Sequence, residues 1–300
     1  MGVAAGGGFP QWNCACPNCR DVRRGDHALT PMLQSSLVIS ANNKDWYLVN
    51  VGPDVSRQIE SFPELHAGPG IRETPLAGVI LTDAELDHSI GLLSLREGSH
   101  LTIYGTDTVK KCLHSAFPIF PMLKNYCSWK WQSLTTHTPN RLGVTIEDSI
   151  LIETVPVSSK PPLYVQSNDH DQDDIWEVGL LLKNERSGKS VAYFPTLDRM
   201  TPEIESALHK ADILLVDGTF WSEDELVSIG ATKRNARDMG HLPISGPSGI
   251  IETLSSFSAE RKILIHINNS NPILKKGSKE AEILKRHGIE IAYEGMELEV

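Results

Sequence analysis

The segment from Leu81 to Gly91, LTDAELDHSIG, constrains the possible folds of this chain most strongly. An apolar run, 77–81, leads into it and a helical pattern, 89–95, follows it, which predicts a tight strand-to-helix turn. Four side chains able to bind a metal ion lie on this turn: Asp83, Glu85, Asp87 and His88. A solvated acidic turn with an incidental histidine is the alternative, and distant segments of the chain decide between the two.

Two later apolar runs end on further candidate ligands. The run 213–216 ends at Asp217, and the run 263–265 ends at His266. Strand ends at one edge of a sheet converge in space, where α/β enzymes place their chemistry. Two histidines with one or two carboxylates suit Fe(II), Zn²⁺ or Mn²⁺, and such a set with open positions is typical of Fe(II) oxygenases. The pattern therefore predicts a metal site, although a lone histidine or aspartate after a strand is usually a capping residue.

A CxCxxC motif near the N-terminus predicts a second metal site. Cys14, Cys16 and Cys19 have a spacing that can bind one Zn²⁺ tetrahedrally, with a fourth ligand from elsewhere. Such a closed site is structural, because it leaves no open position for catalysis. Unrelated buried thiols are the alternative. The odd number of cysteines, five, suits a reducing compartment better than a disulfide framework.

Composition excludes several classes of protein. The net charge of -10, with no basic stripe, argues against a nucleic-acid partner. No apolar run reaches the ~18 residues that a membrane span needs, and no secretory signal is visible. We therefore expect a soluble, cytoplasmic protein. Strand patterns alternate with helical patterns along the whole chain, which predicts an α/β fold in one domain, and residues 158–174 are expected to form an exposed loop.

The chain resembles a known superfamily at these motifs. The acidic turn is similar to the HxHxDH motif of the metallo-β-lactamase superfamily, the strand ending in Asp217 resembles its bridging-aspartate strand, and His266 resembles its last histidine ligand. The resemblance implies a four-layer αββα sandwich, with residues 1–300 as a single domain and the zinc-binding loop at 14–19. More narrowly, nearly the full chain resembles the coenzyme PQQ biosynthesis protein B family, through AAGGGFPQWNCACPNC, TDAELDHSIGLLSLREG, LLVDGTFW, DMGHL and HINNSNPIL.

Departures from the superfamily pattern bear on the mechanism. Asp83 and Glu85 stand where the two leading histidines of HxHxDH bind a first metal, and the third histidine's position falls at Ser158 or Ser159. A histidine-rich first site therefore cannot form. The second site keeps its ligands, which are Asp87, His88, Asp217 and His266. One metal is expected, without the clamp that two-metal hydrolysis uses.

Family resemblance implies an activity that fits one metal. The expected reaction is an iron-dependent, O₂-using hydroxylation of the tyrosine ring of a Glu–Tyr cross-linked amino acid during PQQ (pyrroloquinoline quinone) synthesis. Two alternatives remain: a metal-dependent hydrolase whose second metal is held by Asp83 and Glu85, and a non-catalytic carrier of PQQ or its precursor in release or transport. The sequence does not determine the oligomeric state, for which a homodimer is one alternative.

The resemblance also suggests roles for other residues. A GH-containing loop in related hydrolases brings a histidine beside the metal, so His241 is expected to carry protons or to act as an extra ligand. Asp83 and Glu85 are expected to bind the metal, to orient His88 or to contact substrate. Trp12, Arg96, Asn269 and Asn271 are candidate residues of the cofactor pocket.

Two departures concern the N-terminal region. A related phosphodiesterase branch with a similar CxCxxC takes its fourth zinc ligand from a histidine three residues beyond the last active-site histidine, where this chain has Asn269. The fourth ligand is therefore expected to be Asn269, His27 or Asp26. The family normally has a short apolar strand before the glycine-rich loop, and 1–3 leaves little of it, so either the sheet edge is incomplete or the start is misassigned.

Overall fold

The computed structural model describes residues 1–98, 100–136, 138–143, 149–166 and 174–300. These residues group into two compact units. The first unit holds Ser36–Lys189 with Met1 and Val300, and the second holds Gly2–Ser35 and Ser190–Glu299. The expectation of a single domain over residues 1–300 stays a prediction.

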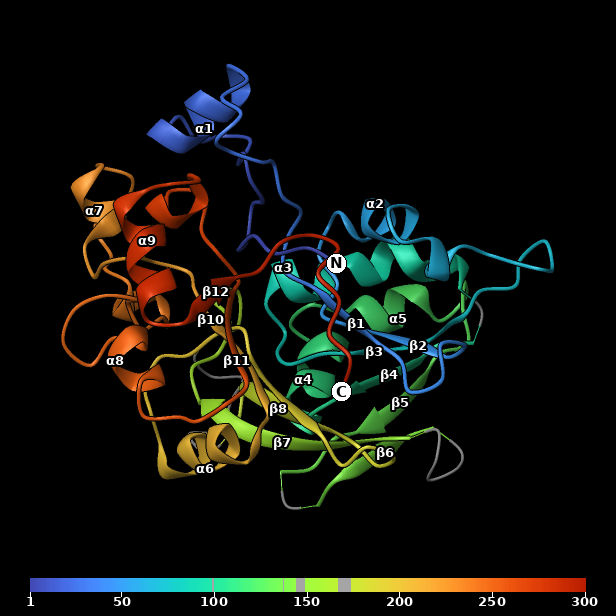
Figure 1. The fold of residues 1–300 in the computed structure, drawn as a ribbon. Helices are drawn as coiled ribbons and strands as arrows, with labels where there is room; N and C mark the ends of the chain where they lie inside the picture. Colours follow the sequence, from blue (N-terminus) through green and yellow to red (C-terminus); the bar gives the residue numbers. More distant parts are fainter. Residues whose placement is uncertain (99, 137, 144–148, 167–173) are drawn as a thin grey trace. The chain divides into compact units, whose positions relative to one another are not determined.

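The first unit contains a five-stranded sheet whose strands follow chain order (Figure 1). The strands are β1 (Leu37–Ile39), β2 (Trp46–Val49), β3 (Leu76–Ile80), β4 (Thr102–Gly105) and β5 (Lys130–Ser133). β1 and β2 form an antiparallel hairpin, and β2 to β5 are parallel neighbours. Asn42 shapes the hairpin turn, since its side-chain oxygen accepts hydrogen bonds from the backbone N–H groups of Lys44 and Asp45, both at 2.9 Å.

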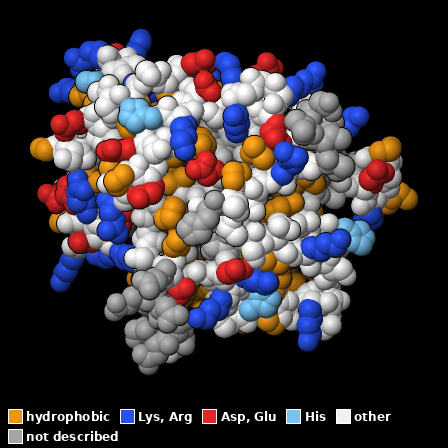
Figure 2. All heavy atoms as spheres, turned by 90° about the horizontal axis from the view of Figure 1, so that it is seen from below, with side chains coloured by type: hydrophobic (Ala, Val, Ile, Leu, Met, Phe, Trp, Pro, Cys, Tyr) orange, Lys and Arg blue, Asp and Glu red, His pale blue; other side chains and the backbone are white. Residues whose placement is uncertain are grey.

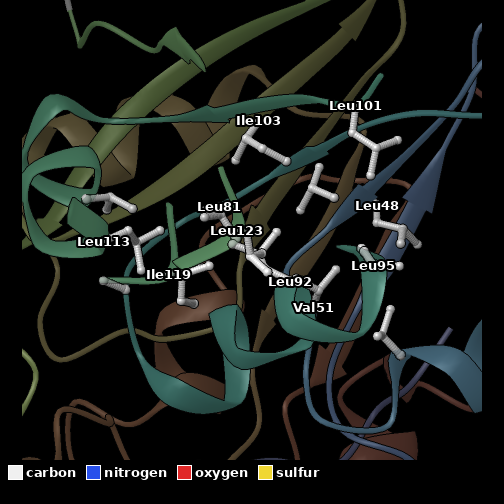
Figure 3. Packing of buried hydrophobic residues seen from close by; sticks show 14 of the residues in the cluster. Leu48, Val51, Leu81, Leu92, Leu95, Leu101, Ile103, Leu113, Ile119 and Leu123 are labelled. Atoms are coloured by element: carbon white, nitrogen blue, oxygen red, sulfur yellow. The ribbon is translucent and has the colours of Figure 1, made fainter. Parts of the chain in front are cut away.

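Short helices and one hydrophobic cluster support this sheet. The helices are α2 (Val55–Glu60), α3 (Leu86–Ser89), α4 (Asp107–His114) and α5 (Ile119–Leu123), with the 3-10 turns η1 (Pro63–Leu65) and η2 (Ile90–Glu97). Thr106 caps α4 by accepting a hydrogen bond from the N–H of Val109. Figure 3 shows the cluster, in which the fully buried Leu81 packs with residues of the helices and of the sheet. The turn that follows Leu81 is therefore anchored in the core.

Three antiparallel strands complete the first unit. They are β6 (Asn140–Leu142), β7 (Ile150–Ser158) and β8 (Glu177–Asn184). β7 pairs with both neighbours, and its pairing with β8 shifts register between Pro156 and Ser158. Residues 167–173, which include most of the acidic part of the predicted exposed loop, lie outside the described residues.

The second unit contains parallel strands in the order β12, β11, β10, β9. They are β9 (Ser190–Phe194), β10 (Ile213–Asp217), β11 (Arg261–Ile265) and β12 (Ile289–Ile291). Every residue of β9 and β10 is buried, which explains their continuous apolar sequences. Asp217 pairs with Ile265 in register, and His266 is the next residue after Ile265. Asp217 and His266 therefore lie at the same edge of this sheet, as the sequence predicts.

Helices and an N-terminal segment surround these strands. The helices are α6 (Pro202–Lys210), α7 (Glu225–Ser228), α8 (Ile250–Leu254) and α9 (Lys279–Arg286), with η3 (Arg237–Met239) and η4 (Pro272–Leu274). The side chain of Thr201 caps the start of α6, and the side chain of Ser278 caps the start of α9. The N-terminal segment carries α1 (Pro17–Arg23) and forms single β-bridges from Ala4 to Gln34 and to Ile267.

The surface carries both signs of charge. On the face in Figure 2, Lys and Arg side chains are interspersed with Asp and Glu side chains. Within the described part of the chain, no helix combines the length and the apolar character needed to cross a membrane.

Candidate metal centres

The acidic turn of the first unit holds His88 in one orientation. Asp83 and His88 are 1% and 2% exposed, and Asp83 Oδ2 lies 2.7 Å from His88 Nδ1. Asp83 also accepts hydrogen bonds from Thr82 Oγ1 at 2.7 Å and from the N–H of Glu85 at 2.9 Å. A carboxylate on one ring nitrogen fixes the tautomer of a histidine and directs the other nitrogen, here Nε2, to act as a metal ligand.

The backbone of this turn is fixed by close contact with the loop after β2. The N–H of Val51 donates to His88 O at 2.7 Å, and the N–H of Gly91 donates to Val51 O at 2.9 Å. A Cβ at Gly91 would lie 2.3 Å from Gly52 O, so this position requires glycine. Asn50 of the same loop bonds to Thr82 through both its amide nitrogen and its oxygen. The position of the turn therefore depends both on the apolar run before it and on the glycine at position 91.

The charges of this turn favour a bound cation. Burial, together with the nearby carboxylates of Asp83 and Asp87, raises the pKa of Glu85 to about 7. Burial alone would lower the pKa of His88, but the carboxylates of Asp83 and Asp87 and the hydrogen bond to Asp83 raise it to about 10. The metal-free turn thus holds a proton at His88, and a metal ion at this histidine would replace that positive charge.

The second unit brings three candidate ligands together. One ligand atom each from Asp217, His241 and His266 lies within 4.8 Å of the other two. Asp217 is fully buried at the end of β10, and its Oδ2 lies 2.8 Å from His241 Nδ1. The imidazole rings of His241 and His266 stack with centroids 5.5 Å apart. His241, expected from the sequence to lie at the metal, is thus grouped with two of the predicted ligands.

Thr219 orders these ligands. Its hydroxyl lies 2.7 Å from Asp217 Oδ1 and 2.9 Å from His266 Nδ1, and its N–H donates to Asp217 Oδ1 at 2.9 Å. The N–H of Leu197 donates to Asp217 Oδ2 at 2.9 Å. Gly218 permits the close turn after the strand, since a Cβ there would lie 2.8 Å from the side chain of Leu264. The donor set of this group, two imidazoles and a carboxylate, fits Fe(II), Zn²⁺ or Mn²⁺.

The thiols of Cys14, Cys16 and Cys19 form a compact cluster within 4.8 Å. The side-chain amide nitrogen of Asn269 faces all three sulfur atoms, at 3.1, 3.5 and 3.3 Å. Burial opposes ionisation of the cluster, yet hydrogen bonds from neighbouring groups lower the pKa of Cys14, whereas burial and the neighbouring thiols raise the pKa of Cys19 to about 12. Three clustered sulfurs suit Zn²⁺, which stabilises thiolates.

The structure places the other two candidates for the fourth zinc ligand elsewhere. Asp26 accepts a hydrogen bond from Lys275 Nζ at 2.9 Å, and His27 is exposed. Of the three candidates, Asn269 is thus the residue at the thiols.

The remaining predicted pocket residues differ in their local surroundings. Trp12 is 86% exposed, and Arg96 donates to Leu93 O at 3.2 Å and pairs with Glu97. Asn271 is buried, with its amide nitrogen donating to Gly218 O and Thr219 O. Their assignment to a cofactor pocket stays a prediction.

Three functional contacts were not expected from the sequence. Thr219 and Asn50 bond to the turns that carry candidate ligands, and the hydroxyl of Tyr164 donates to Ala84 O on the acidic turn. The sequence does carry a signal for two hydroxyl groups. Thr219 follows Asp217 by two positions in LLVDGTFW, and Thr82 directly precedes Asp83 in TDAELDH. Nothing in the sequence marks Tyr164, which lies 80 positions from Ala84.

Comparison with known proteins agrees with these features. A profile of the beta-lactamase superfamily domain matches residues 45–267. Coenzyme PQQ synthesis protein B from Cupriavidus necator is 44% identical over 99% of this chain and 97% of its own length, and its namesake from Klebsiella pneumoniae is 41% identical over 99% and 96%.

Solved structures agree as well. The Zn²⁺-bound PqqB from Methylobacterium extorquens is 32% identical, with a TM-score of 0.88 over 100% of this chain and 98% of that one. A diphosphatase of the PhnP family, 16% identical with a TM-score of 0.67 over 100% of this chain and 95% of that one, shares the fold. The predicted metallo-β-lactamase-type α/β fold is thus confirmed. The chain belongs to the coenzyme PQQ synthesis protein B family within the metallo-β-lactamase superfamily.

Proposed function

We propose that this chain acts in the synthesis of coenzyme PQQ as an O₂-using hydroxylase with one active-site metal ion, Fe(II). The relatives named for PQQ synthesis, which match almost the full chain, support the pathway. One observation carries the choice of a single metal, namely the hydrogen bond of 2.7 Å between Asp83 Oδ2 and His88 Nδ1. Through this bond Asp83 orients His88, whereas dinuclear hydrolases of the superfamily have a metal ligand at the position of Asp83.

A second metal at Asp83 would compete with the orientation of His88. Asp83 Oδ2 lies in hydrogen-bond contact with His88 Nδ1, and Asp83 also accepts hydrogen bonds from Thr82 and from the N–H of Glu85. A metal bound through Oδ2 would displace His88, a proposed ligand of the first metal, and would leave a buried donor unpaired at a cost of ~1–3 kcal/mol. The hydrolase alternative needs that second metal, because two-metal hydrolysis stabilises both attacking and leaving oxygens.

The proposed ligands are Asp87, His88, Asp217 and His266, with His241 as an extra ligand or proton carrier. The superfamily motif supports this combination, and the donor types fit Fe(II), as well as Zn²⁺ or Mn²⁺. Bound Fe(II) with open coordination positions would supply the redox chemistry for O₂. Hydroxylation places one oxygen atom of O₂ on the ring and the other in water, and it consumes two electrons from a reductant together with two protons.

Two side chains are placed to handle protons. His241 Nδ1 is held by Asp217 Oδ2 at 2.8 Å, which leaves the opposite side of the ring to exchange a proton or to bind the metal. Glu85 is half-buried and its pKa is raised to about 7 by burial and by the neighbouring carboxylates, so it changes protonation near neutral pH. We propose the tyrosine ring of a Glu–Tyr cross-linked amino acid as the substrate and O₂ as the co-substrate.

The thiol cluster is proposed to hold a structural Zn²⁺ with Asn269 as the fourth ligand. An asparagine amide can be rotated by 180° to exchange its nitrogen and oxygen, so the oxygen can take the position facing the sulfurs. Asn269→Ala should lower the zinc retained after dialysis against a chelator, whereas His27→Ala should retain as much zinc as the unmodified protein. Equal retention in both variants would exclude this fourth ligand.

The hydroxylase proposal is tested against its rivals by oxygen dependence. A tyrosine-containing precursor should be consumed with O₂ uptake in the Fe(II)-loaded protein, and hydrolysis of phosphodiester or lactone substrates with Mn²⁺ or Zn²⁺ should be absent. Turnover without O₂ would favour the hydrolase. Tight binding of PQQ with no O₂ uptake under any metal would favour the carrier.

A further inference from the structure

The segment 266–271 belongs to both candidate metal centres of the second unit. His266 is grouped with Asp217 and His241, and Asn269 directs its amide at the three thiols. The backbone of His266 is left-handed, with φ of 59°, a conformation that a residue other than glycine keeps only where the surrounding contacts enforce it. The contacts of this segment therefore control where the His266 ring is presented.

Asn18 connects α1 to this segment. Its side chain is buried, and its amide nitrogen donates to Asn269 O at 3.1 Å and to Asn271 O at 2.9 Å. Asn18 lies between Cys16 and Cys19 in the sequence, and the Cys16 side chain caps α1 by accepting from the N–H of Cys19. A change in the geometry of the thiols therefore moves the donor that holds the backbone of 269–271.

Asn271 continues the connection to the end of β10. Its buried amide nitrogen donates to Gly218 O at 3.0 Å and to Thr219 O at 3.2 Å, and the N–H of Asn268 also donates to Thr219 O. The hydroxyl of Thr219 in turn lies within hydrogen-bond distance of Asp217 Oδ1 and His266 Nδ1. Buried hydrogen bonds thus run from the thiol cluster to the ligands of the other centre.

We propose that Asn18 and Asn271 are positioning residues that couple the thiol cluster to the ligand group of Asp217, His241 and His266. Zinc at the thiols fixes α1 and the 266–271 segment, and thereby pre-orients His266 and Asp217 for a divalent ion. Zinc removal leaves three sulfurs without a common cation and frees the segment, so the second ion binds more weakly. This inference rests on the proposed metal binding by the ligand group, and it is independent of the hydroxylase reaction.

The coupling is measurable as a binding affinity. Mn²⁺ is a suitable probe, because it prefers carboxylate and imidazole ligands to thiolates and its free form is counted by electron paramagnetic resonance. The Kd for Mn²⁺ is measured on the full chain with one equivalent of Zn²⁺ bound and again after zinc removal under reducing conditions. We expect binding to be about 10-fold tighter in the zinc-bound protein, the lower end of the effect of outer-shell partners.

Asn18→Ala tests the route of this coupling. In the variant, the ratio between the two Kd values should fall to below about 2, and the zinc-bound Kd should weaken towards the zinc-free value. Asn13→Ala is the matched control, because Asn13 is an exposed asparagine shortly before α1 and bonds only to Gln11 among the contacts described. The control should keep the full ratio. Zinc content and circular dichroism are recorded for each protein.

The outcomes separate the inference from the function on which it rests. Equal Kd values with and without zinc in the unmodified protein would overturn the coupling, as would an unchanged ratio in a folded, zinc-loaded Asn18→Ala protein. If the unmodified protein binds no Mn²⁺ in either state, the ligand group itself is refuted and the coupling with it. Should Asn18→Ala not fold, Asn18→Asp keeps the size of the side chain and removes its donors.

Discussion

Replacing Asp83 by asparagine should weaken the binding of the proposed active-site metal but leave zinc bound at the thiol cluster. The carboxylate of Asp83 accepts three hydrogen bonds, from His88 and Thr82 on one oxygen and from the N–H of Glu85 on the other. An asparagine has one acceptor oxygen, so its NH₂ group must face at least one of these donors. The buried donor left unpaired costs ~1–3 kcal/mol of folding stability.

The effect of Asp83→Asn on the metal follows from the same geometry. A neutral amide no longer supplies the charge that orients His88 and raises the basicity of its ring. Loss of such an outer-shell carboxylate typically weakens metal affinity by about 10- to 100-fold, which corresponds to ~1.4–2.8 kcal/mol of binding free energy. Titration with Mn²⁺ measures this change, and Asp45→Asn, in the exposed hairpin turn, is the matched control.

The same substitution changes how stability depends on pH in the metal-free protein. The folded-state pKa of His88, about 10, lies above its ordinary value of 6.5, since the surrounding carboxylates outweigh the effect of burial. The stabilisation is therefore fully present below about pH 6.5 and is lost as the pH rises towards about 10. Chemical denaturation across this range should show a smaller loss for Asp83→Asn than for the unmodified protein. Equal metal affinity and equal pH dependence in both proteins would refute the orienting role of Asp83.

Further predictions concern glycine, a buried carboxyl and the zinc loop. Gly91→Ala should destabilise the protein by ~1–3 kcal/mol, because its Cβ would lie 2.3 Å from a backbone oxygen, and thermal unfolding should show a smaller effect for Gly98→Ala. Burial raises the pKa of Glu225 to about 7, so this group loses its stabilising neutral form between about pH 4.5 and 7. Glu225→Gln should therefore flatten the stability profile over that range, and an unchanged slope would contradict this. Asn269→Asp should retain zinc at least as well as the unmodified protein, because a carboxylate oxygen also binds Zn²⁺, and loss of zinc on dialysis would argue against an oxygen ligand there.

Short-range sequence patterns predicted which candidate ligands would lie close together. Apolar runs end at Asp217 and before His266, and the parallel register of β10 and β11 brings these two ends to one edge, as strand-end reasoning expects. The spacing of the three cysteines predicted their clustering in the same way. These features depend on residues close in sequence or on the regular geometry of a sheet.

Contacts between distant segments were not predictable in this way. The bond from Tyr164 to Ala84 O joins a loop to the acidic turn, and Asn18 reaches Asn269 across 251 positions. Such pairings depend on how the chain returns on itself, which no local pattern specifies.

The metal content per chain after anaerobic reconstitution with Fe(II), coupled to O₂ uptake with a tyrosine-containing precursor, tests most directly whether the protein is a hydroxylase with one active-site metal. We predict one zinc and one iron, with uptake abolished and iron lost in His88→Ala but both retained in His287→Ala, a change at an exposed histidine after α9. Two metals in addition to the zinc, or no O₂ uptake from a fully loaded protein, would contradict this prediction.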